Sequence, residues 1–365
     1  MRKWIYTLLM LVPGLTAYGQ NKDGKTYTEE DIVYYSPDST LHFGATLCHP
    51  ASPGKAPVCI FVSGTGKQDR DGTMAGHKVF KQIADYLGQR GIASLRIDDR
   101  GTGQTNGRYE TATTADFATD ILTALSYLRS RKDINKDKIG LISHSEGTAA
   151  AAIALSKTKN VSYWISLAGM MSDGLSSLLQ QNEDLVAAYD MPEYNKKRYN
   201  EIDSIMFHTV YKYAHADSLT LADTLNRTYD RWKVKDDAYF KSLNVGGYDH
   251  FRFPIWMYTQ QATSAWYRFF IRYNPADYLT DVTIPVLALN GDKDKMVACH
   301  PNIDNFKKYL VHDKHITTVI LPGLNHLFLP CKTGLPTEYA SIREPFSGKA
   351  LQIMYEWLQN NVLGK

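Results

Sequence analysis

A serine in a tight turn between a strand and a helix is the first candidate for chemistry. Lys138–Ser143 predicts a strand, Thr148–Leu155 predicts an alanine-rich helix, and Ser143-His144-Ser145-Glu146-Gly147 joins the two. At such a corner the Ser145 hydroxyl projects from the sheet edge, and the helix N-terminus points at it. Gly147 lets strand and helix approach closely, and Ser143 stands where glycine is usual. We predict that Ser145 is a nucleophile; the alternative is an ordinary helix N-cap.

A serine hydroxyl needs a base to take its proton, and that base needs an acid to orient it. His326 follows the predicted strand His315–Leu321, and Asp294 follows the predicted strand Ile284–Asn290. These positions are C-terminal ends of predicted parallel strands, where open α/β sheets bind ligands. The chain order Ser, Asp, His suits a triad in which His326 is the general base and Asp294 its acid, with Asp292 in reserve.

The oxyanion that forms when a carbonyl is attacked needs two backbone N–H donors. Glu146, directly after the predicted nucleophile, is expected to supply one of them. Thr65 or Gly66, in the loop after the apolar run Val58–Val62, is expected to supply the other. The glycines of this loop allow backbone to approach a substrate closely.

The order of the apolar segments indicates the fold that positions these residues. Continuous apolar runs suit strands buried on both faces, and here they alternate with segments of helical periodicity. This alternation predicts an α/β fold with a mostly parallel central sheet and helices on both faces. The predicted strands are residues 31–36, 41–48, 58–62, 92–97, 138–143, 161–167, 284–290 and 315–321.

The alternation stops between residues 171 and 277, where helical, charge-rich segments replace the strand-like runs. We expect a helical cap inserted into one α/β domain, whose two parts are residues 20–170 and 278–365. Within the insertion, ten of the 26 residues from Tyr248 to Tyr273 are aromatic. They could wall an acyl or sugar pocket, although most are expected to form the core of the cap.

The first nineteen residues have the layout of a secretory signal peptide. Arg2 and Lys3 precede the short apolar run Trp4–Val12, and small residues at Ala17 and Gly19 suit a cleavage site. We expect an exported protein, periplasmic or secreted after removal of residues 1–19. No other stretch reaches eighteen apolar residues, so no stable membrane anchor is expected.

Composition limits the partners. A formal net charge of +3 with interspersed charges gives no reason to expect a nucleic-acid partner. The histidine and cysteine spacings match no metal site, and the glycine pairs lack a dinucleotide loop, so we expect no metal and no cofactor. Free buried cysteines are the default. A disulfide between Cys299 and Cys331 is an alternative in an oxidising compartment.

Six segments carry a resemblance to a known family: residues 63–72, 97–103, 113–117, 144–147, 290–294 and 321–326. On these segments the chain resembles the α/β-hydrolase superfamily, within it exported bacterial serine esterases related to dienelactone hydrolases and acyl-peptidase-like enzymes. The resemblance implies the α/β-hydrolase fold and hydrolysis of small-molecule esters with short acyl groups by Ser145, Asp294 and His326, through an acyl-enzyme.

Other interpretations stay open at this stage. A peptidase or amidase of the same fold would use the same residues, and a non-catalytic binding protein could keep the scaffold. Asp98, Asp99 and Arg100 could contact substrate, but an ion-pair role in a turn is the favoured interpretation. Asp69–Asp71 could shape the oxyanion loop or simply brace it.

Overall fold

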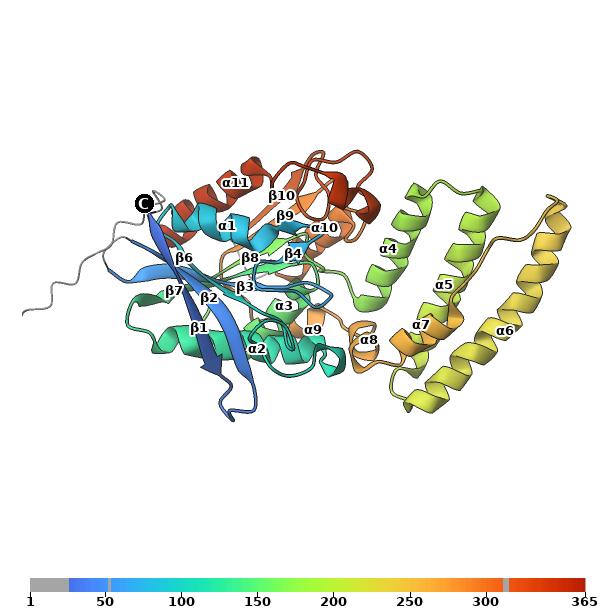
Figure 1. Cartoon of the computed structure of the whole chain (residues 1–365), viewed down its shortest axis with the longest axis horizontal. Coiled ribbons are helices and arrows are strands. Elements are labelled where there is room, and N and C mark those ends of the chain that lie inside the picture. Colours follow the sequence, from blue (N-terminus) through green and yellow to red (C-terminus); the bar gives the residue numbers. More distant parts are fainter. Residues whose placement is uncertain (1–25, 52–53, 311–314, 365) are drawn as a thin grey trace, which may run out of the picture.

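A mostly parallel eight-stranded sheet forms the centre of the molecule (Figure 1). The computed structural model describes residues 26–51, 54–310 and 315–364, so the predicted signal peptide lies outside the described residues. The strand order is β1-β2-β6-β3-β7-β8-β9-β10, with antiparallel β1–β2 and β2–β6 pairs and parallel pairs from β6 onward. The strands are β1 (Tyr27–Tyr35), β2 (His42–Pro50), β3 (Ala56–Val62), β6 (Ala93–Ile97), β7 (Ile134–His144), β8 (Tyr163–Leu167), β9 (Val286–Gly291) and β10 (Ile316–Leu321).

Helices cover both faces of this sheet, as the alternation of apolar patterns predicts. On one face the apolar sides of α1 (Val79–Gly88) and α11 (Gly348–Leu358) pack into a core with residues of β3, β8 and β9. On the other face α2 (Thr114–Ser130), α3 (Gly147–Lys157) and α10 (Cys299–Tyr309) pack against the opposite side chains of the same strands. The predicted fold class is therefore confirmed.

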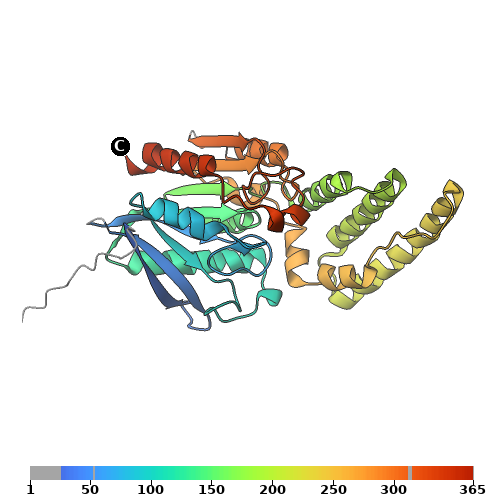
Figure 2. The same ribbon diagram turned by 45° about the horizontal axis from the view of Figure 1, so that its top comes forward.

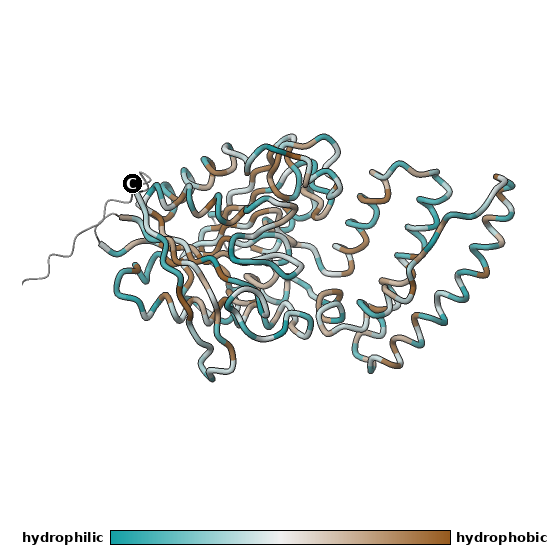
Figure 3. Tube along the Cα trace, viewed as in Figure 1, coloured by the Kyte–Doolittle hydropathy of each residue, from teal (hydrophilic) through white to brown (hydrophobic). Residues whose placement is uncertain are grey.

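Between β8 and β9 the chain forms a helical cap that extends to one side of the sheet (Figures 1 and 2). Its apolar residues form a separate cluster around Ile202, Met206, Leu221 and Leu225. Figure 3 shows hydrophobic residues concentrated in the sheet region and alternating with hydrophilic ones along the cap helices. The cap segment contains α4 (Gly174–Ala188), α5 (Glu193–Tyr213), α6 (Ser218–Leu243), α7 (Ile255–Ala262), α8 (Ala265–Phe270) and α9 (Ala276–Leu279).

One element differs from the sequence-based expectations, and one open alternative is decided in favour of the default of free cysteines. A hairpin of two-residue strands, β4 (Thr73–Met74) and β5 (His77–Lys78), precedes α1 and was not predicted. Cys299 and Cys331 are both free, so the disulfide alternative does not hold.

Within the described part of the chain, every helix is too short or too polar to span a lipid bilayer.

Candidate active site

Ser145 occupies the turn between β7 and α3 in a left-handed backbone conformation, with φ of 56°. This conformation costs a non-glycine residue roughly 1–2 kcal/mol, so the surroundings must hold it. The Ser145 N–H donates to the Leu167 carbonyl at the end of β8 (3.0 Å), and its carbonyl accepts from Thr148 N–H (3.0 Å). A Cβ at Gly147 would lie 2.5 Å from the Ser63 carbonyl oxygen, which explains why glycine begins α3.

The Ser143 side chain, which stands where glycine is usual, takes part in a buried chain of hydroxyl groups. Its Oγ accepts a hydrogen bond from Trp164 Nε1 (2.8 Å) and lies 3.0 Å from Thr148 Oγ1. Thr148 Oγ1 in turn lies 2.8 Å from Ser166 Oγ. Because all four side chains are fully buried, this chain satisfies polar groups that would otherwise be stranded beneath the turn.

His326 and Asp294 are in direct contact. His326 Nδ1 lies 2.8 Å from Asp294 Oδ2, and both residues are more than nine-tenths buried. The other Asp294 oxygen accepts from the Met296 and Val297 N–H groups (2.8 and 2.9 Å), which fixes the carboxylate. Asp292 instead accepts from Gly323 N–H (2.7 Å), tying the loop after β9 to the loop after β10. Of the two aspartates, Asp294 is therefore the one placed to orient the imidazole.

Ser145 and His326 line the same cavity of about 300 Å³. No hydrogen bond joins the Ser145 hydroxyl to the His326 ring in the part of the chain that the structure describes. The fully buried His144 donates from Nε2 to the His326 carbonyl (2.9 Å), and the two rings lie 4.6 Å apart. Burial, aided by the neighbouring His326, lowers the pKa of His144 to about 3. The neutral His144 ring therefore packs against the His326 ring and holds the His326 backbone carbonyl.

The backbone N–H groups of the predicted oxyanion donors differ in availability. Gly66 N–H donates to the Tyr109 hydroxyl at 2.7 Å. The N–H groups of Thr65 and Glu146 make no hydrogen bond to any described residue. Thr65 and Glu146 line a second cavity of about 120 Å³ together with Ser145. The two free donors therefore lie beside the serine, whereas the third is engaged by a side chain.

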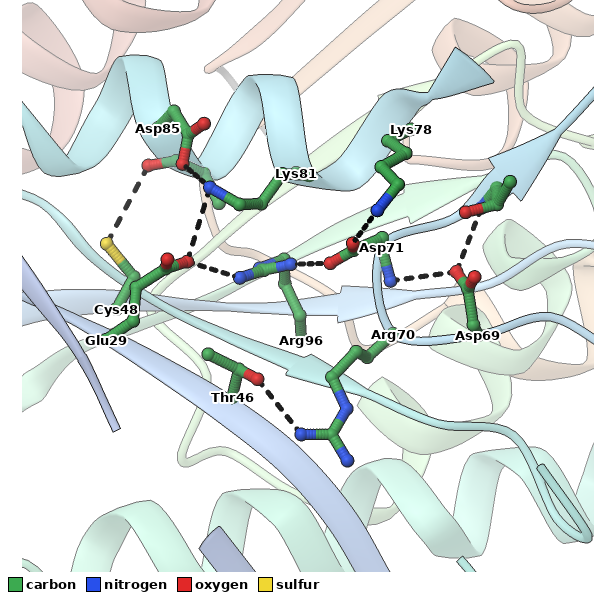
Figure 4. A network of polar contacts seen from close by, with 12 residues as sticks. Glu29, Thr46, Cys48, Asp69, Arg70, Asp71, Lys78, Lys81, Asp85 and Arg96 are labelled. Carbon is green, nitrogen blue, oxygen red and sulfur yellow. Dashed lines mark hydrogen bonds and ion pairs between the residues drawn. The ribbon is translucent and has the colours of Figure 1, made fainter. Parts of the chain in front are cut away.

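Ion pairs brace the loop that carries these donors. Arg70 Nη2 lies 2.6 Å from Asp98. Asp71 pairs with Arg96, which is 2% exposed (Figure 4). Asp69 accepts from the Asp71 N–H (3.0 Å) within the loop itself. No charged residue from 69–71 or 98–100 is among the described residues that line the two cavities. The charged residues at 69–71 and 98–100 thus brace the loop and do not line either cavity.

The cap supplies one wall of the cavities. Leu178 and Gln181 of α4 and Phe270 of α8 line both of them, and Trp266 lines the larger one. Other aromatic residues of the tract, such as Phe251, pack in the core of the cap. The aromatic tract thus divides between the two expected roles, with most of its buried members in cores.

Tyr109 and Trp266 were missed by sequence reasoning. Both contact the site through hydrogen bonds to residues far away in the chain. No local pattern marks them, although Trp266 lies in the aromatic tract that was singled out.

The fold and the placement of these residues define an α/β hydrolase. Residues 71–330 match the family described as serine aminopeptidase, S33 (Hydrolase_4), and the chain belongs to this family. The protein is therefore a hydrolase.

Proteins similar to this chain differ in how much of it they match and in sequence identity. Esterase EstD of Thermotoga maritima is 31% identical over 125 residues, which are 34% of this chain and only 28% of that protein. The Pyrococcus furiosus esterase Pf2001 has a TM-score of 0.56 at 13% identity, over 98% of this chain and 99% of that one. Est1E of Butyrivibrio proteoclasticus, solved with ferulic acid, has a TM-score of 0.51 at 15% identity, over 91% and 100%. At such identities the two structures establish the fold alone.

Proposed function

We propose that this protein is a serine carboxylesterase that hydrolyses short acyl esters through an acyl-enzyme. The observation that carries the proposal is the buried contact between Asp294 and His326 in a cavity that Ser145 also lines. A positioned imidazole with a fixed tautomer beside a serine in a strained turn is the arrangement that serine hydrolases use. The free hydroxyl suits this role, because catalytic hydrogen bonds often tighten only when substrate is bound.

Each step moves one proton through His326. Its Nε2 takes the proton of Ser145 Oγ as the oxygen attacks the ester carbonyl, while Asp294 accepts from Nδ1–H. The free N–H groups of Thr65 and Glu146 donate to the resulting oxyanion. The imidazolium then protonates the departing alcohol, leaving an acyl-Ser145. A water molecule, deprotonated by the same ring, then attacks the acyl group. The carboxylic acid leaves as the imidazolium returns its proton to Ser145 Oγ, which restores the serine.

The charges around the cavities favour esters over peptides with a free amino terminus. An aminopeptidase needs an anionic group to bind the ammonium of its substrate. Among the described residues that line the two cavities, Glu146 is the only carboxylate, and both of its oxygens already accept hydrogen bonds. A neutral ester therefore fits these walls better than a charged peptide end, because an unpaired charge is costly to bury.

A fluorophosphonate probe and a panel of p-nitrophenyl esters of increasing chain length test the proposal. We expect covalent labelling that disappears in Ser145→Ala, and turnover that is highest for short acyl groups. Aminoacyl anilides and acetylated sugars belong in the same panel. Cleavage of the anilides alone would replace the esterase by a peptidase, and a well-folded wild type that is never labelled would indicate a binding protein.

We also propose that residues 1–19 are removed during export. Intact-mass measurement of protein from the cell envelope and medium of an expressing bacterium tests this, since cleavage after Gly19 predicts an N-terminus at Gln20. Full-length protein confined to the cytoplasm would contradict it.

A further inference from the structure

The Glu146 side chain joins three separate elements beside the nucleophile. Its Oε2 accepts from Thr65 Oγ1 in the loop after β3 (2.7 Å). Its Oε1 accepts from Thr114 Oγ1 at the start of α2 and from Trp266 Nε1 in cap helix α8, each at 2.7 Å. One carboxylate thus links the oxyanion loop, the α/β core and the cap.

This carboxylate is costly to place. Glu146 is 3% exposed, and burial raises its pKa, while the three donors act in the opposite direction. Buried carboxylates are retained where their hydrogen bonds are complete, and here three hydroxyl or indole donors converge on two oxygens. The proposed catalytic steps use only the backbone N–H of Glu146, so they leave this side chain without a role.

Of the three contacts of the Glu146 carboxylate, the one with Thr65 bears on the proposed oxyanion site, because Thr65 carries one of the two free N–H groups. Thr65 lies on the exposed side of its loop, and its hydroxyl has no other hydrogen-bond partner among the described residues. The next residue is held independently, because Gly66 N–H donates to the Tyr109 hydroxyl, whose ring stacks on Phe117 at 5.1 Å. On the other side, Ser63 Oγ donates to Asp99 (2.5 Å). The loop is thus held before and after Thr65, and the Glu146 contact fixes Thr65 itself, the residue that carries the free N–H.

We propose that the Glu146 carboxylate is a positioning residue that sets the oxyanion site and couples it to the cap. It holds the Thr65 N–H, one oxyanion donor, at a fixed place relative to its own N–H, the other donor. Through Trp266 it holds α8, and hence the Phe270 wall, against the same point. The kinetic part of this inference rests on the proposed esterase function.

Thr65→Val tests the loop contact, since valine keeps the shape and removes the hydroxyl. A donor displaced by about 1 Å can cost on the order of 100-fold in rate. We expect kcat to fall about 10- to 100-fold with KM little changed, and Thr65→Ser to recover most of this loss. Trp266→Phe removes the indole N–H together with part of a ring that lines the cavity and stacks on Phe270, so it should mainly raise KM. Trp256→Phe is its matched control, because Trp256 is 74% exposed on the cap and should leave both constants unchanged.

Hydrogen–deuterium exchange tests the same linkage without any turnover. Thr65→Val should speed amide exchange in residues 63–66, and Trp266→Phe should speed it in residues 264–270. Glu146→Gln should disturb both segments less than Glu146→Ala, since its Oε1 still accepts from two donors. Unchanged exchange in all variants would overturn the positioning role, as would a loss of unfolding temperature with kcat intact. A wild type that neither hydrolyses esters nor reacts with fluorophosphonate would refute the esterase proposal alone, because exchange still decides the linkage.

Discussion

Asp294 contacts His326 through one carboxylate oxygen while the backbone of its own loop holds the other oxygen. This two-sided fixation leaves the carboxylate a single orientation in front of the imidazole. A side chain held in this way selects the tautomer with a proton on Nδ1 and leaves Nε2 free as a base.

Asp294→Asn should lower kcat by roughly 10³- to 10⁴-fold with little loss of folding, because the amide favours the wrong imidazole tautomer. Steady-state kinetics with a p-nitrophenyl ester measures this. Asp292→Asn is the matched control, since Asp292 contacts Gly323 N–H and not the ring. If the two variants lose activity equally, the loops rather than the carboxylate–imidazole contact are what matter.

Ser143→Ala should destabilise the protein by about 1–3 kcal/mol, because it leaves the buried Trp164 Nε1–H without an acceptor. Urea unfolding gives the free energy. The double variant Ser143→Ala/Trp164→Phe removes donor and acceptor together, so a double-mutant cycle should give a favourable coupling of about 1 kcal/mol. Additive losses would mean that this hydrogen bond contributes nothing to stability.

The sheet and the grouping of the site residues could be predicted because both depend on local pattern plus one topological rule. Runs such as Val58–Val62 are strands buried on both faces, and parallel strands bring their C-terminal loops to one edge. Ser145, Asp294 and His326 were assigned on that basis. The β4–β5 hairpin escaped prediction, since strands of two residues have no periodicity to detect.

The side-chain contacts of the oxyanion loop could not be predicted. The Tyr109 hydroxyl accepts a hydrogen bond from Gly66 N–H, 43 residues away in the chain. Trp266 Nε1 donates one to the Glu146 carboxylate, 120 residues away. Such contacts depend on how the cap and the α2 region pack against the loop, and no spacing in the sequence encodes a distance between packed elements. For the same reason the sequence left Thr65 and Gly66 as equal candidates.

His144 makes the stability of the protein depend on pH. Its pKa is lowered from the ordinary 6.5 to about 3, mainly by burial, so the unfolded chain binds a proton more readily than the folded one. The contribution of the neutral ring is therefore complete above pH 6.5 and is lost as the pH falls toward 3. His144→Gln keeps a donor for the His326 carbonyl and removes this titration. The variant should lose less stability than wild type between pH 6.5 and 4 in urea unfolding, and parallel curves would refute the assignment.

Gly147 and Gly348 offer a paired test of the tight turn, because each is the first residue of a helix. A Cβ at Gly147 would lie 2.5 Å from one backbone carbonyl oxygen and 2.6 Å from another, whereas a Cβ at Gly348 would meet nothing within 4 Å. Gly147→Ala should therefore cost about 1–3 kcal/mol or more and reduce fluorophosphonate labelling of Ser145, since backbone must move to admit the methyl group. Gly348→Ala should be neutral or stabilising by up to about 1 kcal/mol, because alanine restricts the unfolded chain. The free energy of unfolding in urea and the rate of fluorophosphonate labelling, measured for both variants, test this prediction. Equal stability of the two variants would mean that β3 and α3 do not approach each other as closely as the turn requires.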